Sequence, residues 1–240
     1  MKKYIENDDF WPSISDLMSG LMIIFMFIAI AFMSQVAKEK KGMTDLAEDY
    51  KKVKISIYQE LFKEFETDLN QWNAYIDQET LSIKFREPDI FFEQGSSDLN
   101  YRFKEILDDF FPRYIGILNS DKFCDEIEEV RIEGHTSTEW TRNSTPMESY
   151  FKNMELSQNR TRSTLHYVMT LDSMNSHENF MIEKVTANGL SYSKKIMENG
   201  VEDKKMSRRV EFKIRTKAEQ KIDEILARAN KDSDLNNETN

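Results

Sequence analysis

LMSGLMIIFMFIAIAFMSQVA, residues 17–37, is an uncharged run made mostly of Leu, Ile, Met, Phe and Ala. At roughly 1.5 Å per residue, a helix of this length spans about 30 Å, the thickness of the hydrocarbon core of a bilayer. A core helix of a soluble protein would carry polar residues on one side, and this run does not. It predicts a single membrane-spanning helix, which we place at residues 13–37 after a short N-terminal segment, residues 1–12.

One acidic residue lies at the N-terminal edge of this predicted span. Pro12 suits the first turn of a helix, and Trp11 suits the level of the lipid headgroups. Asp16 follows about one turn later, where a carboxylate is costly unless it faces protein, water or a cation. Two interpretations stay open at this point: Ser13 and Asp16 form a capping box at the helix start, or Asp16 has a function at the membrane.

Length and composition limit the remaining possibilities. The 240 residues hold a membrane anchor and one soluble domain of ordinary size. The net charge of −10 gives no electrostatic support to a nucleic-acid partner, and we expect none. The single cysteine, Cys124, excludes an internal disulfide framework and a multi-cysteine metal site.

Motifs for metal binding and catalysis are absent from the sequence. The three histidines (His135, His166 and His177) lack the spacing of a zinc motif such as HExxH, so we expect no metal site. The glycines are isolated and form no phosphate-binding loop, and GxSxG does not occur. We therefore expect neither a cofactor nor enzymatic activity.

An amphipathic linker helix is predicted after the span, at residues 38–79. Apolar residues step by three and four and then continue in a shifted register, as a helix requires. The stripe consists of Met43, Leu46, Tyr50, Val53, Ile57, Leu61, Phe65, Leu69, Trp72 and Ile76. It must be buried against a second copy of the chain, the following domain or the membrane. We favour a second copy, and hence a homodimer.

Residues 80–217 predict a soluble domain in which strands and helices alternate. Expected strands are 81–85, 130–133, 180–189 and 210–214; expected helices are 100–119 and 156–171, with a loop at 139–150. Gly134 is expected to end the second strand. This order predicts an α+β fold, a small α/β sandwich with helices over one face of one sheet. Residues 218–240 are expected to form a short C-terminal helix and a disordered tail.

Three separated motifs occur in this domain: IEGHT at 132–136, NMELSQNR at 153–160 and SRRVE at 207–211. Their order resembles the OmpA-like peptidoglycan-binding domain, in which a strand ends in GHTD, a helix opens with NxxLSxxR and a final strand opens with NRRV. The resemblance covers roughly residues 80–216. It implies binding to the free carboxylate of diaminopimelate in the peptide stems of the cell wall.

The resemblance also implies which residues bind peptidoglycan. They are Arg160, Asn153, Leu156, Ser137, Thr136 and His135. Arg160 matches the arginine of the family, and its planar guanidinium suits bidentate binding of a carboxylate. Ser137 stands where the family has an aspartate, so recognition of the ammonium group loses its charged partner. The alternative is structural: His135 and Thr136 brace the loop, and Leu156 is partly a core residue.

A span with an aspartate at its entrance, followed by an OmpA-like domain, is similar to the flagellar stator B subunits (MotB-like proteins). In those stators, two B subunits sit inside a ring of five multi-span A subunits, and the aspartate carries the transported H⁺ or Na⁺. Asp16 aligns with that residue. Ser13, Ser15 and Ser19 would supply hydroxyl groups along the ion path. Within these stators, WPSISDLMSGLM at 11–22 looks most like the B component of Zorya anti-phage defence systems.

These resemblances imply a subunit of an ion-driven rotary complex in the bacterial inner membrane. It would hold peptidoglycan and signal envelope perturbation to cytoplasmic effectors. A flagellar-type stator subunit and a passive membrane-to-wall tether are the alternatives. We place the N-terminus in the cytoplasm and the C-terminal domain in the periplasm because the implied wall ligand is periplasmic. The count of Lys2 and Lys3 before the span against Lys38, Lys40 and Lys41 after it favours the opposite orientation.

Overall fold

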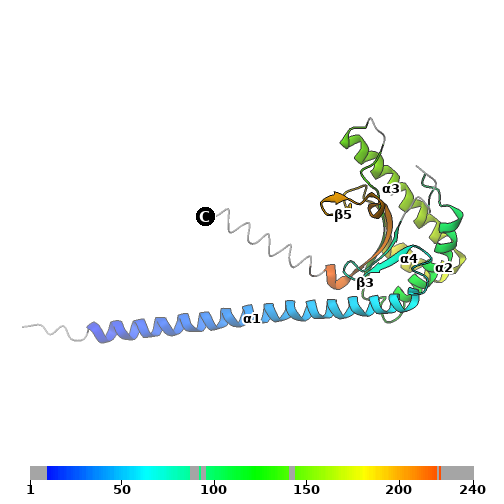
Figure 1. The fold of residues 1–240 in the computed structure, drawn as a ribbon. Helices are drawn as coiled ribbons and strands as arrows, with labels where there is room; N and C mark the ends of the chain where they lie inside the picture. The colour runs from blue at the N-terminus through cyan, green and yellow to red at the C-terminus, as the bar shows by residue number, and fades with distance from the viewer. Residues whose placement is uncertain (1–9, 87–91, 93–95, 141–143, 221, 223–240) are drawn as a thin grey trace, which may run out of the picture. The chain divides into compact units, whose positions relative to one another are not determined.

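The computed structural model describes residues 10–86, 92, 96–140, 144–220 and 222, with side chains from Ser15 onward (Figure 1). The chain divides into two units, residues 1–48 and residues 49–240. Helix α1, Phe10–Phe65, begins in the first unit and ends in the second. The two units are described in turn.

The first unit consists of the apolar part of α1. Its large side chains are exposed along the whole run, with Leu17 at 74% and Phe32 at 67%. Within the described part of the chain, this is the one helix long and apolar enough to cross a membrane, and none of its most apolar window is buried. Such a surface needs lipid or a partner protein to cover it. The prediction of a long apolar N-terminal helix is confirmed.

The helix start bears on the capping interpretation of Asp16. Helix α1 begins at Phe10, and its first turn contains no acidic residue. Ser13 and Asp16 therefore lie inside the helix, whereas a capping residue must precede the first turn. The capping-box interpretation is wrong, and Asp16 is a carboxylate on the body of an apolar helix.

The second unit contains a five-stranded sheet with the strand order β1-β2-β7-β3-β4. Its strands are β1 Ala74–Asp77, β2 Ser82–Arg86, β3 Ile127–His135, β4 Val185–Gly189 and β7 Arg209–Thr216. Strands β3 and β4 are parallel, and the other neighbours are antiparallel. The last strand, β7, thus lies in the middle of the sheet, between β2 and β3.

Helices α2 and α3 pack against one face of this sheet (Figure 1). The remaining elements are α2 Tyr101–Leu118, α3 Pro146–Met169, the 3₁₀ helix η2 Asp172–His177, α4 Glu178–Lys184, β5 Met197–Glu198, β6 Val201–Glu202 and α5 Lys204–Ser207. The ring of Phe110 on α2 lies 5.2 Å from that of Phe85 on β2 and 5.0 Å from that of Phe212 on β7. The predicted α+β fold, with helices over one face of a sheet, is confirmed.

The C-terminal part of α1 belongs to the core of this domain. Ile57, Leu61 and Phe65 are buried there, and the Phe65 ring lies 5.3 Å from that of Phe110. The second half of the linker stripe is therefore covered by the domain of its own chain. The sequence favoured burial of the stripe against a second copy of the chain. Only the more exposed first half of the stripe, which includes Met43, is still open for such pairing among the described residues.

The predicted linker helix at 38–79 is too long. Helix α1 ends at Phe65, and Asn73 adopts a left-handed conformation with φ 51° before β1 begins at Ala74. Ile76 pairs with Ile83 on β2. Leu69 and Trp72 lie in turns and Ile76 lies in β1, so the helical spacing of the stripe continues past the end of the helix itself.

The predicted second helix of the domain begins too late. Helix α3 starts at Pro146, within the segment predicted to be a loop. Thr145 accepts a hydrogen bond from the backbone N–H of Glu148, and the Glu148 carboxylate accepts one from the backbone N–H of Thr145. This capping box, with proline in the first turn, was a readable signal of a helix start.

Two predicted strands also differ from the structure. Residues 180–184 belong to α4, so only 185–189 of the expected strand at 180–189 form β4. Strand β3 continues through Gly134, where it was expected to stop, because Gly134 pairs with Gly189 on one side and Val210 on the other. Of the expected C-terminal helix, residues 217–220 and 222 are helical. Its remainder, the predicted tail and most of residues 1–12 lie outside the described residues.

Candidate functional site

Arg160, the predicted carboxylate ligand, lies on the buried side of α3 and is 5% exposed. Its Nε donates a hydrogen bond of 3.0 Å to the backbone carbonyl of Ser96, and its guanidinium lies 4.8 Å from the centre of the Phe92 ring. Arg160 therefore holds the connection between β2 and α2 against α3. It is a buried cation at the junction of three segments.

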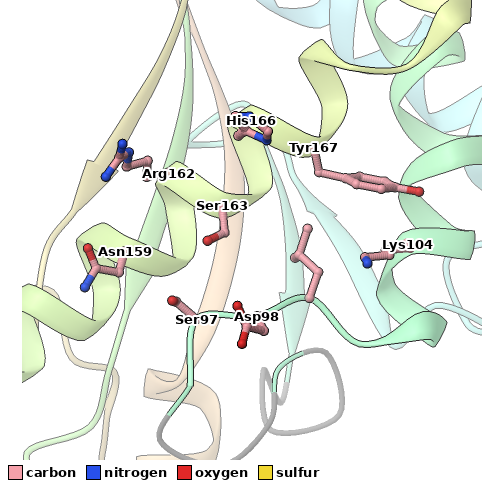
Figure 2. Close-up of a pocket in the computed structure, with 9 residues that line it drawn as sticks. Ser97, Asp98, Lys104, Asn159, Arg162, Ser163, His166 and Tyr167 are labelled. Carbon is pink, nitrogen blue, oxygen red and sulfur yellow. The ribbon is translucent and has the colours of Figure 1, made fainter.

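A polar cavity of about 510 Å³ opens next to this junction (Figure 2). Its lining residues are Ser97, Asp98, Leu99, Lys104, Asn159, Arg162, Ser163, His166 and Tyr167. The Tyr167 hydroxyl donates a 2.7 Å hydrogen bond to Asp108, while the Nζ atom of Lys104 lies 5.6 Å from the centre of the Tyr167 ring. The lining contains three basic side chains and one carboxylate, a composition that favours binding of an anionic group. The sequence did not reveal this cavity because α2, α3 and the loop before α2 each supply part of it.

The predicted residues at the end of β3 are held against the first turns of α3. Thr136 and Ser137 are buried, and the backbone N–H of Thr136 donates to the carbonyl of Ser191 at 2.9 Å. From α3, Nδ2 of Asn153 donates to the carbonyl of Glu139 at 3.3 Å. Asn153, predicted to bind peptidoglycan, is 2% exposed and fixes the loop that contains Thr136 and Ser137. Leu156 is half-buried on the same helix.

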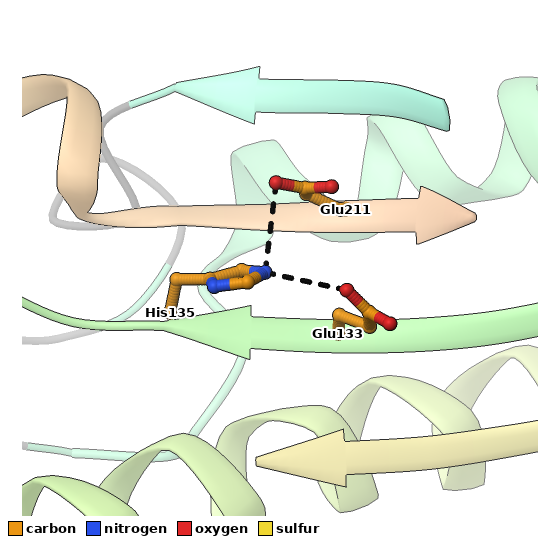
Figure 3. A group of neighbouring side chains, drawn as sticks. All are labelled: Glu133, His135 and Glu211. Carbon is orange, nitrogen blue, oxygen red and sulfur yellow. Dashed lines mark ion pairs between the residues drawn. The ribbon is translucent and has the colours of Figure 1, made fainter. Parts of the chain in front are cut away.

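His135 points away from α3. A Cβ atom on Gly134 would lie 2.8 Å from the backbone oxygen of Ser157, so Gly134 faces that helix. Because side chains alternate along a strand, His135 lies on the other face of the sheet (Figure 3). The structure therefore separates His135 from Arg160, and a single small ligand does not contact both.

Charged groups cover this second face of the sheet. Lys84 donates to Asp77 at 2.6 Å, and Nε of Arg209 donates to Glu211 at 2.5 Å. Burial raises the pKa of Asp77, but its hydrogen bonds with Lys84 and Thr80 outweigh that effect and lower the pKa to about 2. Burial lowers the pKa of His135 below its ordinary value despite the neighbouring carboxylates.

Within this charged face, Glu133, His135 and Glu211 are the residues that could hold a metal ion. One ligand atom from each lies within 4.8 Å of the other two, and all three residues are buried. Sequence spacing missed this group because Glu211 reaches the other two only through the pairing of β7 with β3. The Glu-x-His alternation along β3 was a signal, although a weak one.

The predicted ion-carrying residues lie on α1. Asp16, Ser15 and Ser19 are exposed, and Ser19 follows them by three and four positions, which places the three on one side of the helix. The side chain of Ser13 lies outside the described residues. A carboxylate with two neighbouring hydroxyl groups is a chemically suitable, though incomplete, set of ligands for a cation.

Comparison with known proteins identifies the family. The Zorya protein ZorB of Escherichia coli (strain ATCC 8739) is 45% identical over 227 residues, covering 94% of this chain and 96% of that protein. The chain belongs to the ZorB family. A second Zorya protein ZorB, from Escherichia coli O139:H28 (strain E24377A), is 26% identical over 213 residues, 85% of this chain and 79% of that protein. Because the first match exceeds the length of either unit, ZorB similarity includes both the apolar helix and the domain.

Other comparisons are less specific. No protein-family model matches the chain. A MotB-like protein from Desulfovibrio vulgaris aligns with a TM-score of 0.48 and 17% identity, covering 71% of this chain and 98% of that one. The cell wall anchor of the T6SS from Pseudomonas aeruginosa aligns with a TM-score of 0.45 and 17% identity, covering 65% and 97%.

Proposed function

We propose that this ZorB-family chain is the peptidoglycan-anchored B subunit of an ion-driven, stator-type complex of the bacterial inner membrane that acts in anti-phage defence. The observation that carries the proposal is Asp16. It is an exposed carboxylate inside an uninterrupted apolar helix, in a chain whose family membership extends over both units. A passive anchor has no use for a carboxylate within its membrane-spanning helix.

The ion-carrying role follows from the cost of such a carboxylate in a bilayer. Asp16 needs a cation, water or protein beside it, and a ring of multi-span A subunits around two copies of this chain would supply the protein. Binding and release of H⁺ or Na⁺ would then change the charge that Asp16 presents to the ring. Ser15 and Ser19 lie on the same side of α1 and would add hydroxyl ligands. The N-terminus lies in the cytoplasm and the domain in the periplasm.

The wall contact is assigned to the part of the domain around Arg160. A guanidinium there suits the carboxylate of a peptide stem, and Asn153, Thr136 and Ser137 shape the loop beyond the end of β3. His135 is left out of this contact because it lies on the other face of the sheet. The neutral Ser137 predicts weaker binding than an aspartate at the same position would give.

Substitution of Asp16 tests the ion-carrying role. Asp16→Asn keeps the size of the side chain but cannot bind and release a proton, so bacteria carrying the complete set of partner proteins should lose their protection in a phage plating assay. Asp16→Glu should retain part of it. Asp45→Asn, at an exposed position beyond the apolar run, is the matched control and should protect fully. Full protection by Asp16→Asn would contradict the ion-carrying role and leave the passive membrane-to-wall tether as the explanation.

Sedimentation with purified peptidoglycan tests the wall contact. The full chain in detergent should co-sediment with peptidoglycan, and Arg160→Ala should reduce the bound fraction several-fold. Arg102→Ala, an exposed substitution on α2, should bind like the unaltered chain. Arg160 is buried, so thermal unfolding of each variant must accompany the assay. If Arg162→Ala abolishes binding while Arg160→Ala does not, the wall site is the cavity of Figure 2.

A further inference from the structure

Glu133, His135 and Glu211 form a compact buried group on the face of the sheet opposite α3 (Figure 3). Glu133 on β3 is the direct register partner of Glu211 on β7, and His135 follows Glu133 on the same face. Two carboxylates directly opposite each other across an antiparallel pair repel one another. Their burial increases that repulsion because little water screens it. A positive charge between them would remove the conflict.

The separations fit ligands that share one metal ion. Nε2 of His135 lies 3.6 Å from Oε2 of Glu133 and 3.5 Å from Oε1 of Glu211. Both distances exceed those of good hydrogen bonds. Ligand atoms about 2.0–2.1 Å from a tetrahedral Zn²⁺ lie roughly 3.3 Å from one another. A small inward movement of the two carboxylates would complete three of four ligand positions.

The imidazole of His135 provides an independent observation. Its side chain is 2% exposed, and within the described part of the chain neither Nδ1 nor Nε2 has a hydrogen-bond partner. Buried polar atoms without a partner are rare in folded proteins and call for an explanation. Nε2 points between the two carboxylates (Figure 3), where a metal ion would accept its lone pair.

The surrounding cations orient the carboxylates of this group but pair closely with only one of them, that of Glu211. Arg209 donates to Oε1 of Glu211 at 2.5 Å, the type of contact that fixes a carboxylate ligand from outside a metal site. Lys84 lies 3.9 Å from the same oxygen but makes its short contact, 2.6 Å, with Asp77. Among the described residues, no lysine or arginine forms an ion pair with Glu133, although Lys213 and Arg131 lie near enough to lower its pKa. These neighbours reduce the affinity for a cation, but they leave Glu133 and His135 without other strong partners.

We propose that Glu133, His135 and Glu211 bind one divalent transition-metal ion, of which Zn²⁺ best suits one imidazole and two carboxylates. The ion would join the end of β3 to β7. Thr136 and Ser137 follow His135 directly, so the ion would also fix the start of the loop that leads to α3. This is a structural site, and it does not depend on the proposed function in the membrane.

Zinc titration of the full chain tests the site. The chain is purified in detergent with a tag that lacks histidines, stripped with EDTA and titrated with ZnCl₂ by calorimetry, while bound zinc is measured by mass spectrometry. We expect one equivalent of Zn²⁺ per chain and a rise in the unfolding temperature. Co²⁺ in its place should give the visible absorption of a four-coordinate ion.

Three variants distinguish this site from adventitious binding. Glu133→Gln preserves size and should weaken zinc binding by at least about 10-fold, and His135→Gln should abolish the stoichiometric site. His166→Gln removes an exposed histidine from the other face and should bind like the unaltered chain. Circular dichroism of each metal-free variant checks that it folds. If His135→Gln does not fold, the zinc affinity of Glu133→Gln decides the test. Absence of stoichiometric zinc, or equal binding by the unaltered chain and Glu133→Gln, overturns the proposal.

Discussion

Arg113, on α2, donates a 2.9 Å hydrogen bond from Nη2 to the backbone carbonyl of Glu64, in the last turn of α1. Its Nε donates to the carboxylate of the same residue at 2.7 Å, and Nη1 donates to Asp68 at 3.0 Å. Nη1 also donates to Asp109 at 3.1 Å, so one guanidinium satisfies a carbonyl that the helix end leaves open and binds three carboxylates. The last turn of α1 is fixed to α2 by this residue.

Arg113→Ala should therefore destabilise the domain. Loss of hydrogen bonds to three carboxylates and a carbonyl, at a side chain that is 31% exposed, should lower the free energy of unfolding by about 2 kcal/mol. Arg113→Lys keeps the charge but not the planar guanidinium, so its free energy of unfolding should lie between those of the unaltered chain and Arg113→Ala. Denaturant unfolding of the full chain in detergent measures the difference. Arg102→Ala, on the exposed side of α2, should change stability little; an equal loss there would contradict the assignment.

Gly189→Ala should disrupt the packing of α3 on β4. A Cβ atom at this position would lie 2.3 Å from the backbone nitrogen of Gln158 and 2.5 Å from its Cα. Gln158 cannot move aside easily, since it hydrogen-bonds to Ala187 and Gly189 on the same strand. The forced separation should cost about 3 kcal/mol or more.

Gly116→Ala is the matched control for this steric argument. Nothing lies within 4 Å of a Cβ atom at Gly116, which is part of α2. The higher helix propensity of alanine should raise the stability by up to about 1 kcal/mol. Thermal unfolding of both variants checks the pair. A mild effect of Gly189→Ala would show that α3 and β4 separate more readily than the contacts imply.

The ion pair of Asp77 and Lys84 should make the domain sensitive to acid. The pKa of Asp77 is lowered from 3.8 to about 2, so its ionised form favours the folded state. This stability is present above about pH 4 and is lost as the pH falls through 2. After allowance for screening of a side chain that is 23% exposed, it amounts to about 1 kcal/mol.

Asp77→Asn provides the comparison for the acid dependence. Asparagine still accepts hydrogen bonds from the backbone N–H groups of Glu79 and Thr80, which Oδ1 accepts here at 2.9 and 3.1 Å, but it does not titrate. The free energy of unfolding, followed by fluorescence between pH 5 and 2, should fall less steeply for Asp77→Asn. Parallel curves would mean that Asp77 is not stabilised by Lys84 in solution.

The two halves of the linker stripe should respond differently to substitution. Leu61→Ala removes a side chain that is 1% exposed in the core, and should cost about 3 kcal/mol of domain stability. Met43→Ala, at a side chain that is 49% exposed, should leave domain stability unchanged. If a homodimer forms through the first half, Met43→Cys in a Cys124→Ser background should cross-link between copies, whereas Leu61→Cys should not. Efficient cross-linking at Leu61 would contradict its burial in the core.

Local patterns were sufficient where the interacting residues are neighbours in the chain. Helix α2 was predicted within one residue at each end because Asn100 caps it and its apolar positions repeat with helical spacing. The predicted start of α3 was late because the apolar stripe, rather than the capping box of Thr145 and Glu148, was used to place it. Strand β3 was predicted to be too short because Gly134 looked like a strand end, although it is the point of close contact with α3.

The sequence by itself determined the apolar helix, the acidic residue within it and the order of the motifs, because each depends on residues within a few positions of one another. Only the tertiary structure decided which face His135 occupies, that Arg160 is buried against Phe92 and Ser96, and that Glu211 lies opposite Glu133. These relationships depend on strand order and register. The pairing of distant strands, rather than any local spacing, brings those side chains together.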